Sequence, residues 1–187
     1  MDDDIRVYVV RSRRKTVSAE IDKDLSVLVR APLRMSEKDI RKFLQSNEDW
    51  IRKHRRKLAE RQEKTKDIPK LTIEELHELA DQAMLDIPPR AARYARLAGV
   101  TYGRITIRNQ RTRWGSCSSK GNLNFNCLLM LAPEEHRDYV IVHELCHRRE
   151  MNHSKRFWAE VERILPDYKK SMKWFRDNGE SILARLP

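Results

Sequence analysis

The spacing of apolar residues changes along the chain from a two-residue to a helical repeat, and this change predicts the order of its elements. Apolar and polar residues alternate in three short stretches near the start, Ile5 to Val10, Thr16 to Ile21 and Leu25 to Val29. Alternation with a period of two is typical of strands with one buried face. We therefore predict a small antiparallel sheet that ends at Ala31-Pro32.

An amphipathic stripe follows these strands. Ser36 resembles the start of a capping box, and apolar residues recur at helical spacing from Ile40 to Ile51. The pattern predicts one long helix that continues into a strongly basic segment. The stretch from Lys64 to Lys70 is the expected linker, so residues 1–70 form an N-terminal region made of an antiparallel sheet and a basic helix.

The rest of the chain, residues 71–187, begins with helical signals. Thr72 and Glu75 form a second capping box, which predicts the start of a helix. Pro88-Pro89 lack the amide hydrogens that a helix interior needs, so we predict a break there. A further helix is expected to end at Gly99, because glycine readily adopts the positive φ of a helix C-cap.

Strand signals come next, followed again by helices. Arg113 to Cys117 and Asn122 to Cys127 flank a Lys120-Gly121 turn, which predicts a hairpin. Pro133 with two following glutamates indicates a helix start. The remaining expected elements are a strand around Ile105 and Ile107 and two helices, Ser154 to Leu165 and Tyr168 to Arg176, the last ending before Gly179.

The helix after Pro133 contains His143-Glu144-Leu145-Cys146-His147, which has the spacing of a metal site with its own general base. Two histidines one turn apart lie on one helix face, where both imidazoles can bind one ion. Glu144 lies beside that ion and can take a proton from water. His153 follows six residues later and is the candidate third ligand, which leaves the fourth position open as in catalytic zinc sites.

Composition narrows the class of protein. The chain has three cysteines, Cys117, Cys127 and Cys146, without CxxC spacing, which argues against a disulfide framework or a cysteine zinc finger. The sequence starts with acidic Met1 to Asp4 and has no apolar run long enough for a bilayer. We expect a soluble, cytoplasmic protein with no membrane contact.

The net charge of +11 indicates attraction to polyanions. Arg52, Arg55 and Arg56 lie in the densest basic run and share one helix face, so they are the candidate nucleic-acid-binding residues. The alternative is a solvated helix face, because acidic residues are interleaved with the basic ones.

Three segments together resemble the YgjP-like metallopeptidases, which are related to the WLM and SprT-like zincins. The segments are Arg113-Trp114-Gly115-Ser116-Cys117, the run from Tyr139 to His147, and Asn152-His153-Ser154 with Phe157-Trp158. The resemblance implies an α+β fold with a zincin-like catalytic core and one zinc ion per chain. It also implies His143, His147 and His153 as ligands and Glu144 as base. Glu150 stands where metzincins have a turn glycine, so we expect the next helix to supply His153 from its start.

The hairpin beside the motif helix is the expected substrate-binding element. An extended peptide can add to a strand edge by β-augmentation, although both strands can equally be internal to the sheet. The candidate substrate-binding residues on this hairpin are Arg113, Trp114 and Asn126. For the tryptophan, packing in the core is the alternative.

Three functions remain open at this point. The first is a zinc metalloendopeptidase acting on proteins or peptides. The second is a nucleic-acid-associated zincin-fold protein, either a binding module or a protease for DNA–protein crosslinks. The third is a hydrolase of a non-peptide amide. Glu144 favours an enzyme, because a structural zinc site needs no carboxylate beside its ligands.

Overall fold

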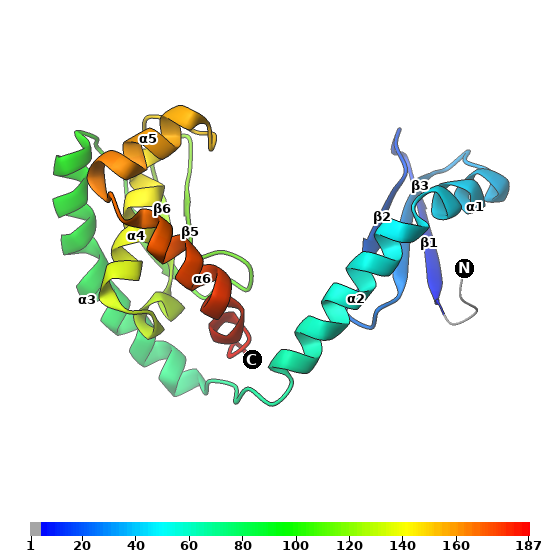
Figure 1. Ribbon diagram of the computed structural model, residues 1–187, viewed down its shortest axis with the longest axis horizontal. Helices are drawn as coiled ribbons and strands as arrows, with labels where there is room; N and C mark the ends of the chain where they lie inside the picture. The colour runs from blue at the N-terminus through cyan, green and yellow to red at the C-terminus, as the bar shows by residue number, and fades with distance from the viewer. Residues whose placement is uncertain (1–4) are drawn as a thin grey trace. The chain divides into compact units, whose positions relative to one another are not determined.

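The computed structural model describes residues 5–187, and the predicted α+β class is confirmed. The chain separates after Asp67 into two compact units, Met1–Asp67 and Ile68–Pro187 (Figure 1). The acidic start of the chain, Met1 to Asp4, lies outside the described residues. Within residues 5–187, no helix combines the length and the apolar character needed to cross a membrane.

The N-terminal unit contains a three-stranded sheet in the order β1-β3-β2. Its strands are β1 (Val7–Ser12), β2 (Ser18–Ile21) and β3 (Val27–Pro32). The central strand β3 pairs antiparallel with β2 but parallel with β1. The prediction of a purely antiparallel sheet is therefore wrong. Alternating residues identify a strand but not the strand that pairs with it. β1 and β2 run in opposite directions at the two edges of the sheet, so β3 between them is parallel to one and antiparallel to the other.

Two helices, α1 (Glu37–Ser46) and α2 (Glu48–Thr65), follow the sheet where one long helix was predicted. The Asn47 backbone interrupts the helical run, with φ −114° and ψ 14°. Its side-chain amide donates to the carbonyl of Phe43 at 2.8 Å, which closes the first helix. One face of the sheet and both helices share a core made of Val27, Val29, Ala31, Ile40, Leu44 and Ile51.

The second unit is built on a small sheet in the order β4-β6-β5. Its strands are β4 (Ile105–Arg108), β5 (Gly115–Cys117) and β6 (Leu123–Asn126). The predicted hairpin is confirmed, because β5 and β6 pair antiparallel and Gly121 has φ 82° in the turn. β4 pairs parallel with β6, so β5 is an edge strand of this sheet. A short 3-10 helix (Cys127–Leu131) follows β6 and was not predicted.

A single helix, α3 (Ile73–Ala98), begins at the predicted capping box of Thr72 and Glu75 and ends at Gly99 with φ 63°. It continues through Pro88 and Pro89, so the predicted break is wrong. Two interior prolines remove hydrogen bonds at a cost of about 3 kcal/mol or more each. The carbonyls that lose these bonds belong to Met84 and Leu85, which are 54% and 79% exposed and open to water. Burial of Ile87, Ala91, Tyr94 and Ala95 favours the unbroken helix.

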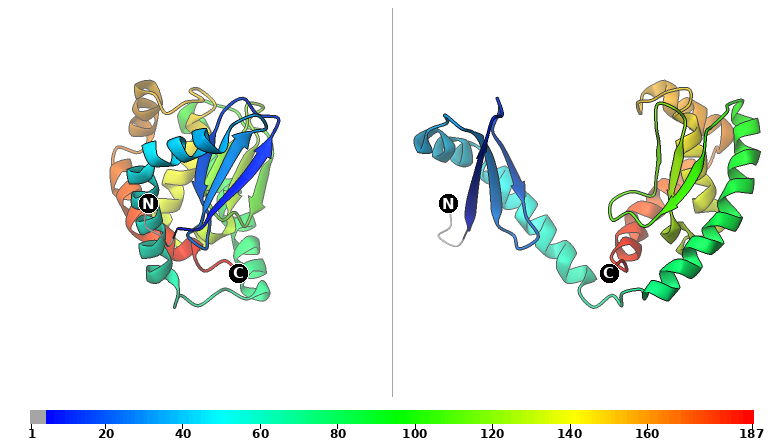
Figure 2. Two further views of the ribbon diagram at one scale, coloured as in Figure 1. Left: turned by 90° about the vertical axis from the view of Figure 1, so that its right-hand side faces the viewer. Right: turned by 180° about the vertical axis from the view of Figure 1, so that it is seen from behind.

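The remaining helices are α4 (Glu134–Cys146), α5 (Lys155–Ile164) and α6 (Tyr168–Leu183). α3 packs along α4, and both contribute to the main core of this unit (Figure 2). α6 continues past Gly179, where the sequence predicted an end. A Cβ atom at Gly179 would lie 3.2 Å from Cζ2 of Trp114, so this glycine allows close packing within a helix.

Candidate metal centre

Helix α4 holds the motif rigidly because it is buried on most of its surface. Val140, Ile141, Val142 and Leu145 are at most 4% exposed. Their side chains fix the rotation of the helix about its axis, and this rotation directs the motif histidines toward the loop between α4 and α5. The apolar run before His143 therefore positions the site.

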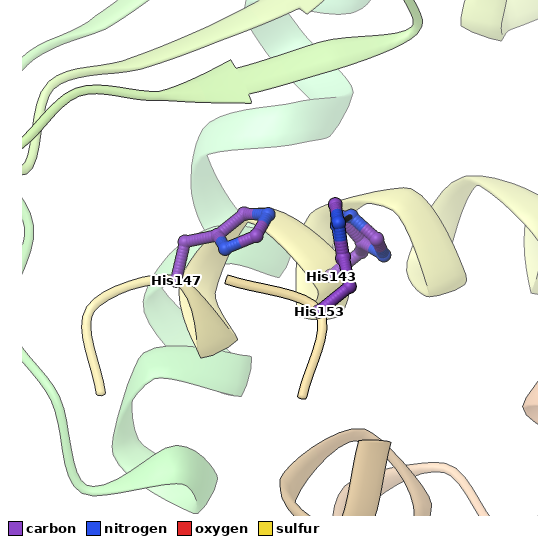
Figure 3. A group of neighbouring side chains, drawn as sticks. All are labelled: His143, His147 and His153. Carbon is purple, nitrogen blue, oxygen red and sulfur yellow. Dashed lines mark hydrogen bonds between the residues drawn. The ribbon is translucent and has the colours of Figure 1, made fainter. Parts of the chain in front are cut away.

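His143, His147 and His153 form a cluster whose potential ligand atoms all lie within 4.8 Å of one another. The Nε2 atoms of His143 and His153 are 3.0 Å apart. Figure 3 shows the three rings turned toward one another, with His143 on α4, His147 at its C-cap and His153 in the loop that follows. His153 directly precedes Ser154, the N-cap of α5, which agrees with the expected helix–loop–helix arrangement. We refer to these residues as the three-histidine cluster.

The surroundings of the cluster fix the orientation of its rings. His147 Nδ1 lies 3.0 Å from the carbonyl oxygen of Glu150, so this nitrogen donates and the Nε2 lone pair stays free. Phe157 packs against all three imidazoles, with ring centroids 4.6 to 4.8 Å apart. Trp158 stacks on His153 at a centroid distance of 5.8 Å. These contacts preorganise the imidazoles for a shared ligand.

The cluster fits a zinc ion by its donor chemistry. Burial lowers the pKa of His143 to about 3, and it also lowers the pKa of His147, so both rings favour the neutral form that binds metals. A tetrahedral ion with Zn–N distances of about 2.0–2.1 Å separates its nitrogen ligands by about 3.3 Å. The 3.0 Å between the Nε2 atoms of His143 and His153 is close to this value.

Glu144 lines the same cavity as the three-histidine cluster, and it is only 6% exposed. Burial raises the pKa of its carboxyl to about 8, and the positive charge of Arg113 acts in the opposite direction. Strand β5 approaches this side chain closely, because a Cβ atom at Gly115 would lie 2.7 Å from Cγ of Glu144. The glycine in the strand thus lets the backbone of an edge strand reach the carboxyl group.

Two neighbouring cavities meet at Glu144. The histidine cavity, of about 240 Å³, contains the three-histidine cluster together with Ser116, Cys117 and Met151. The apolar cavity, of about 330 Å³, is lined mainly by Trp114, Tyr139, Val140, Met172 and Phe175. Arg113, Gly115, His143 and Glu144 line both cavities. No local pattern predicts that α6 lines this cavity, because α6 is separated from α4 along the chain by α5.

The candidate substrate-binding residues occupy different environments. Arg113 is exposed at the mouth of both cavities, and Trp114 is half-buried against Phe175 at a centroid distance of 4.8 Å. Asn126 is fully buried. Its side-chain amide donates to the carbonyls of Gln110 and Arg113 at 2.6 and 2.9 Å, and its Oδ1 accepts from the backbone of Leu128. Asn126 therefore holds the loop before β5, and its contact with substrate stays a prediction.

The candidate nucleic-acid-binding arginines lie on α2 in the N-terminal unit. Arg52 pairs with Glu48 at 3.0 Å, and Arg56 lies 3.7 Å from Glu60. Arg55 Nε donates to the carbonyl of Leu25 at 2.8 Å. Each side chain thus has a partner within its own unit, which weakens the basis for a dedicated phosphate-binding face. Nucleic-acid binding stays a prediction.

The three-histidine cluster and the buried carboxyl beside it are the types of ligand and base that zinc hydrolases use. A family model for the YgjP-like metallopeptidase domain matches residues 15–78 and 72–178. The chain therefore belongs to the YgjP-like metallopeptidases, as the resemblance in its sequence implied.

Two solved metallopeptidase zymogens resemble part of the chain. Abylysin from Pyrococcus abyssi is 21% identical with a TM-score of 0.45, covering 49% of this chain and 93% of the other. Jannalysin from Methanocaldococcus jannaschii is 20% identical with a TM-score of 0.45, covering 50% of this chain and 96% of the other. None of the curated proteins compared with the chain matches it.

Proposed function

We propose that this protein is a zinc-dependent endopeptidase in which His143, His147 and His153 bind the ion and Glu144 is the general base. The observation that carries the proposal is the position of a buried carboxyl beside the three-histidine cluster in one cavity. Three protein ligands leave one coordination position open, as in catalytic zinc sites. When bound, zinc polarises a carbonyl group and makes water more acidic.

The properties of Glu144 suit proton transfer in both directions. A carboxyl group with a pKa raised to about 8 holds a proton more strongly than an exposed glutamate does. It can therefore accept the proton of the attacking water and afterwards donate it to the nitrogen of the leaving amine. Arg113 supplies positive charge nearby, which favours the ionised carboxylate that must accept the proton.

Strand β5 offers a backbone edge for the substrate. Its neighbour in the sheet is β6, so its other side is not paired within the sheet. An extended peptide that adds to Gly115–Cys117 would run past Glu144, since Gly115 contacts that side chain directly. Backbone pairing at this edge would hold the scissile peptide group next to the base.

Metal analysis combined with a cleavage assay tests the proposal. We expect one zinc ion per chain after purification, loss of cleavage of an unstructured protein on chelation, and recovery on addition of zinc. Ala substitution of His143, His147 or His153 should each lower zinc occupancy sharply, whereas His77→Ala on α3 serves as the matched control. Full zinc occupancy in all three variants of the cluster would contradict the ligand assignment.

A further inference from the structure

We propose that the protein prefers peptides with a bulky apolar residue directly next to the scissile bond, and that Met172 on α6 determines this preference. The inference rests on the proposed peptidase function and adds the substrate class. Its basis is the apolar cavity, which opens beside the catalytic carboxyl group.

The cavity has the size and chemistry of a side-chain pocket. Its volume of about 330 Å³ exceeds that of any single side chain, and its walls are aromatic and aliphatic. The aromatic walls are rigid because Trp114 packs on Phe175 and Tyr139 is 8% exposed within the core. Transfer of an apolar side chain into such a pocket is favourable because it removes apolar surface from water.

The position of the cavity limits which substrate residue can enter it. This cavity and the histidine cavity share four lining residues, Arg113, Gly115, His143 and Glu144. The two cavities therefore adjoin at the side chain of Glu144, the proposed general base. Successive Cα atoms of a peptide are about 3.8 Å apart. A peptide whose scissile carbonyl lies at Glu144 therefore places the side chain of an adjacent residue at the cavity entrance.

The charge around the cavity disfavours basic side chains of the substrate. Arg113 is exposed at the cavity mouth, and its positive charge acts on the nearby Glu144. The other charged lining residue, Glu144, is buried and reserved for the reaction. A lysine or arginine of the substrate would meet Arg113 and an apolar wall, without an acidic partner of its own. Basic side chains should thus be disfavoured at this position.

Met172 is the wall residue that can set the width of the cavity. It is 39% exposed on α6, whereas Val140 on the opposite helix is 4% exposed and belongs to the core. A methionine side chain is flexible and adapts to differently shaped ligands. A larger residue at this position should narrow the cavity without disturbing the interior of the unit.

The test is a cleavage assay of zinc-loaded full-length protein with a peptide library that varies the residues on both sides of the cut. We expect wild type to favour Phe, Leu or Met over Ala and Lys at one adjacent position, by at least about tenfold in kcat/KM, because a hydrophobic pocket discriminates by roughly 10–200-fold per methylene. Met172→Trp should reduce cleavage of the Phe peptide at least about tenfold and leave the Ala peptide within about threefold. Met84→Trp on α3, at a residue 54% exposed and away from the cavity, is the matched control and should change neither.

A binding measurement separates this inference from the proposed function. Glu144→Gln protein loaded with zinc should bind the Phe peptide more tightly than the Ala peptide, and Met172→Trp in the same background should remove the difference. Absence of cleavage of every library member by wild type would contradict the peptidase function. Cleavage without an apolar preference, or with a preference that Met172→Trp leaves unchanged, would overturn the inference alone.

Discussion

The carboxyl side chain of Glu144 lies directly against the backbone of Gly115, so closely that a Cβ atom there would be 2.7 Å from Cγ and 2.8 Å from Oε1. The edge strand proposed to hold the substrate and the proposed general base are thus in contact. Gly115 allows this approach because it has no side chain. In the proposed mechanism, Gly115 would connect peptide binding to catalysis without taking part in the chemistry.

Gly115→Ala should therefore impair catalysis while the fold persists. The added methyl group displaces Glu144 or the strand, and a misplacement of about 1 Å can cost roughly 100-fold in rate. We expect kcat/KM to fall by roughly this factor with zinc content unchanged, measured by metal analysis and peptide cleavage. Thr106→Ala on β4 is the control in the same sheet. Wild-type activity in Gly115→Ala would show that the contact has no catalytic role.

The buried carboxyl also makes the stability of the metal-free protein depend on pH. Its pKa is raised from 4.5 to about 8, so the folded state holds a proton that the unfolded state releases between these values. The stability contribution of Glu144 is present below pH 4.5 and is lost as the pH rises to 8. Glu144→Gln lacks this ionisable carboxyl and has no such loss. The difference in unfolding free energy between Glu144→Gln and wild type should therefore change in favour of the variant from pH 4.5 to 8 and level off above pH 8.

Urea unfolding of chelator-treated protein at several pH values measures this difference. Glu135→Gln, at an exposed glutamate in the first turn of the same helix, serves as the control and should show no comparable trend. A constant difference in unfolding free energy between wild type and Glu144→Gln from pH 4.5 to 8 would contradict burial of an ionisable carboxyl at this site.

Arg90 links α3 to the start of the motif helix. Its guanidinium lies 2.9 Å from Asp86 and contacts Glu134 and Asp138 of α4 at 2.7 and 3.0 Å. The Tyr94 hydroxyl donates to the second oxygen of Asp138 at 2.7 Å. Arg90→Ala removes the cation shared by the partly buried Asp86 and Asp138, which keep Arg137 and the Tyr94 hydroxyl as partners, so we expect a loss of about 2–3 kcal/mol in unfolding free energy. Arg96→Ala, at an exposed position on the same helix, should cost less than about 0.5 kcal/mol in the same urea titration.

The local features of the site could be predicted from the sequence because they depend on helix geometry. The spacing of His143 and His147 on one helix follows from its period, and Ser154 as the start of α5 explains where His153 lies. The capping box at Thr72 and the turn at Gly121 are local signals of the same kind. Each of these depends on residues within a few positions of one another.

The features that were predicted wrongly or missed depend on distant residues. The sequence predicted that the helix breaks at Pro88 and Pro89. Burial of α3 against α4 outweighs the hydrogen bonds that these prolines remove, and the helix continues. The sequence predicted a helix end before Gly179. This glycine instead allows close packing against Trp114, which is far away in the sequence. The direction of β1 relative to β3 and the apolar cavity between α4 and α6 likewise arise only when the chain folds.

The most direct test of the central claim is the peptidase activity of Glu144→Gln measured beside that of wild type, both loaded with zinc to the same stoichiometry. General-base catalysis contributes roughly 10²–10⁴-fold. The proposed mechanism predicts that Glu144→Gln retains zinc and native unfolding behaviour while kcat/KM falls by at least about 100-fold. Turnover within a few fold of wild type at equal zinc content would contradict Glu144 as the base, and with it the proposed mechanism.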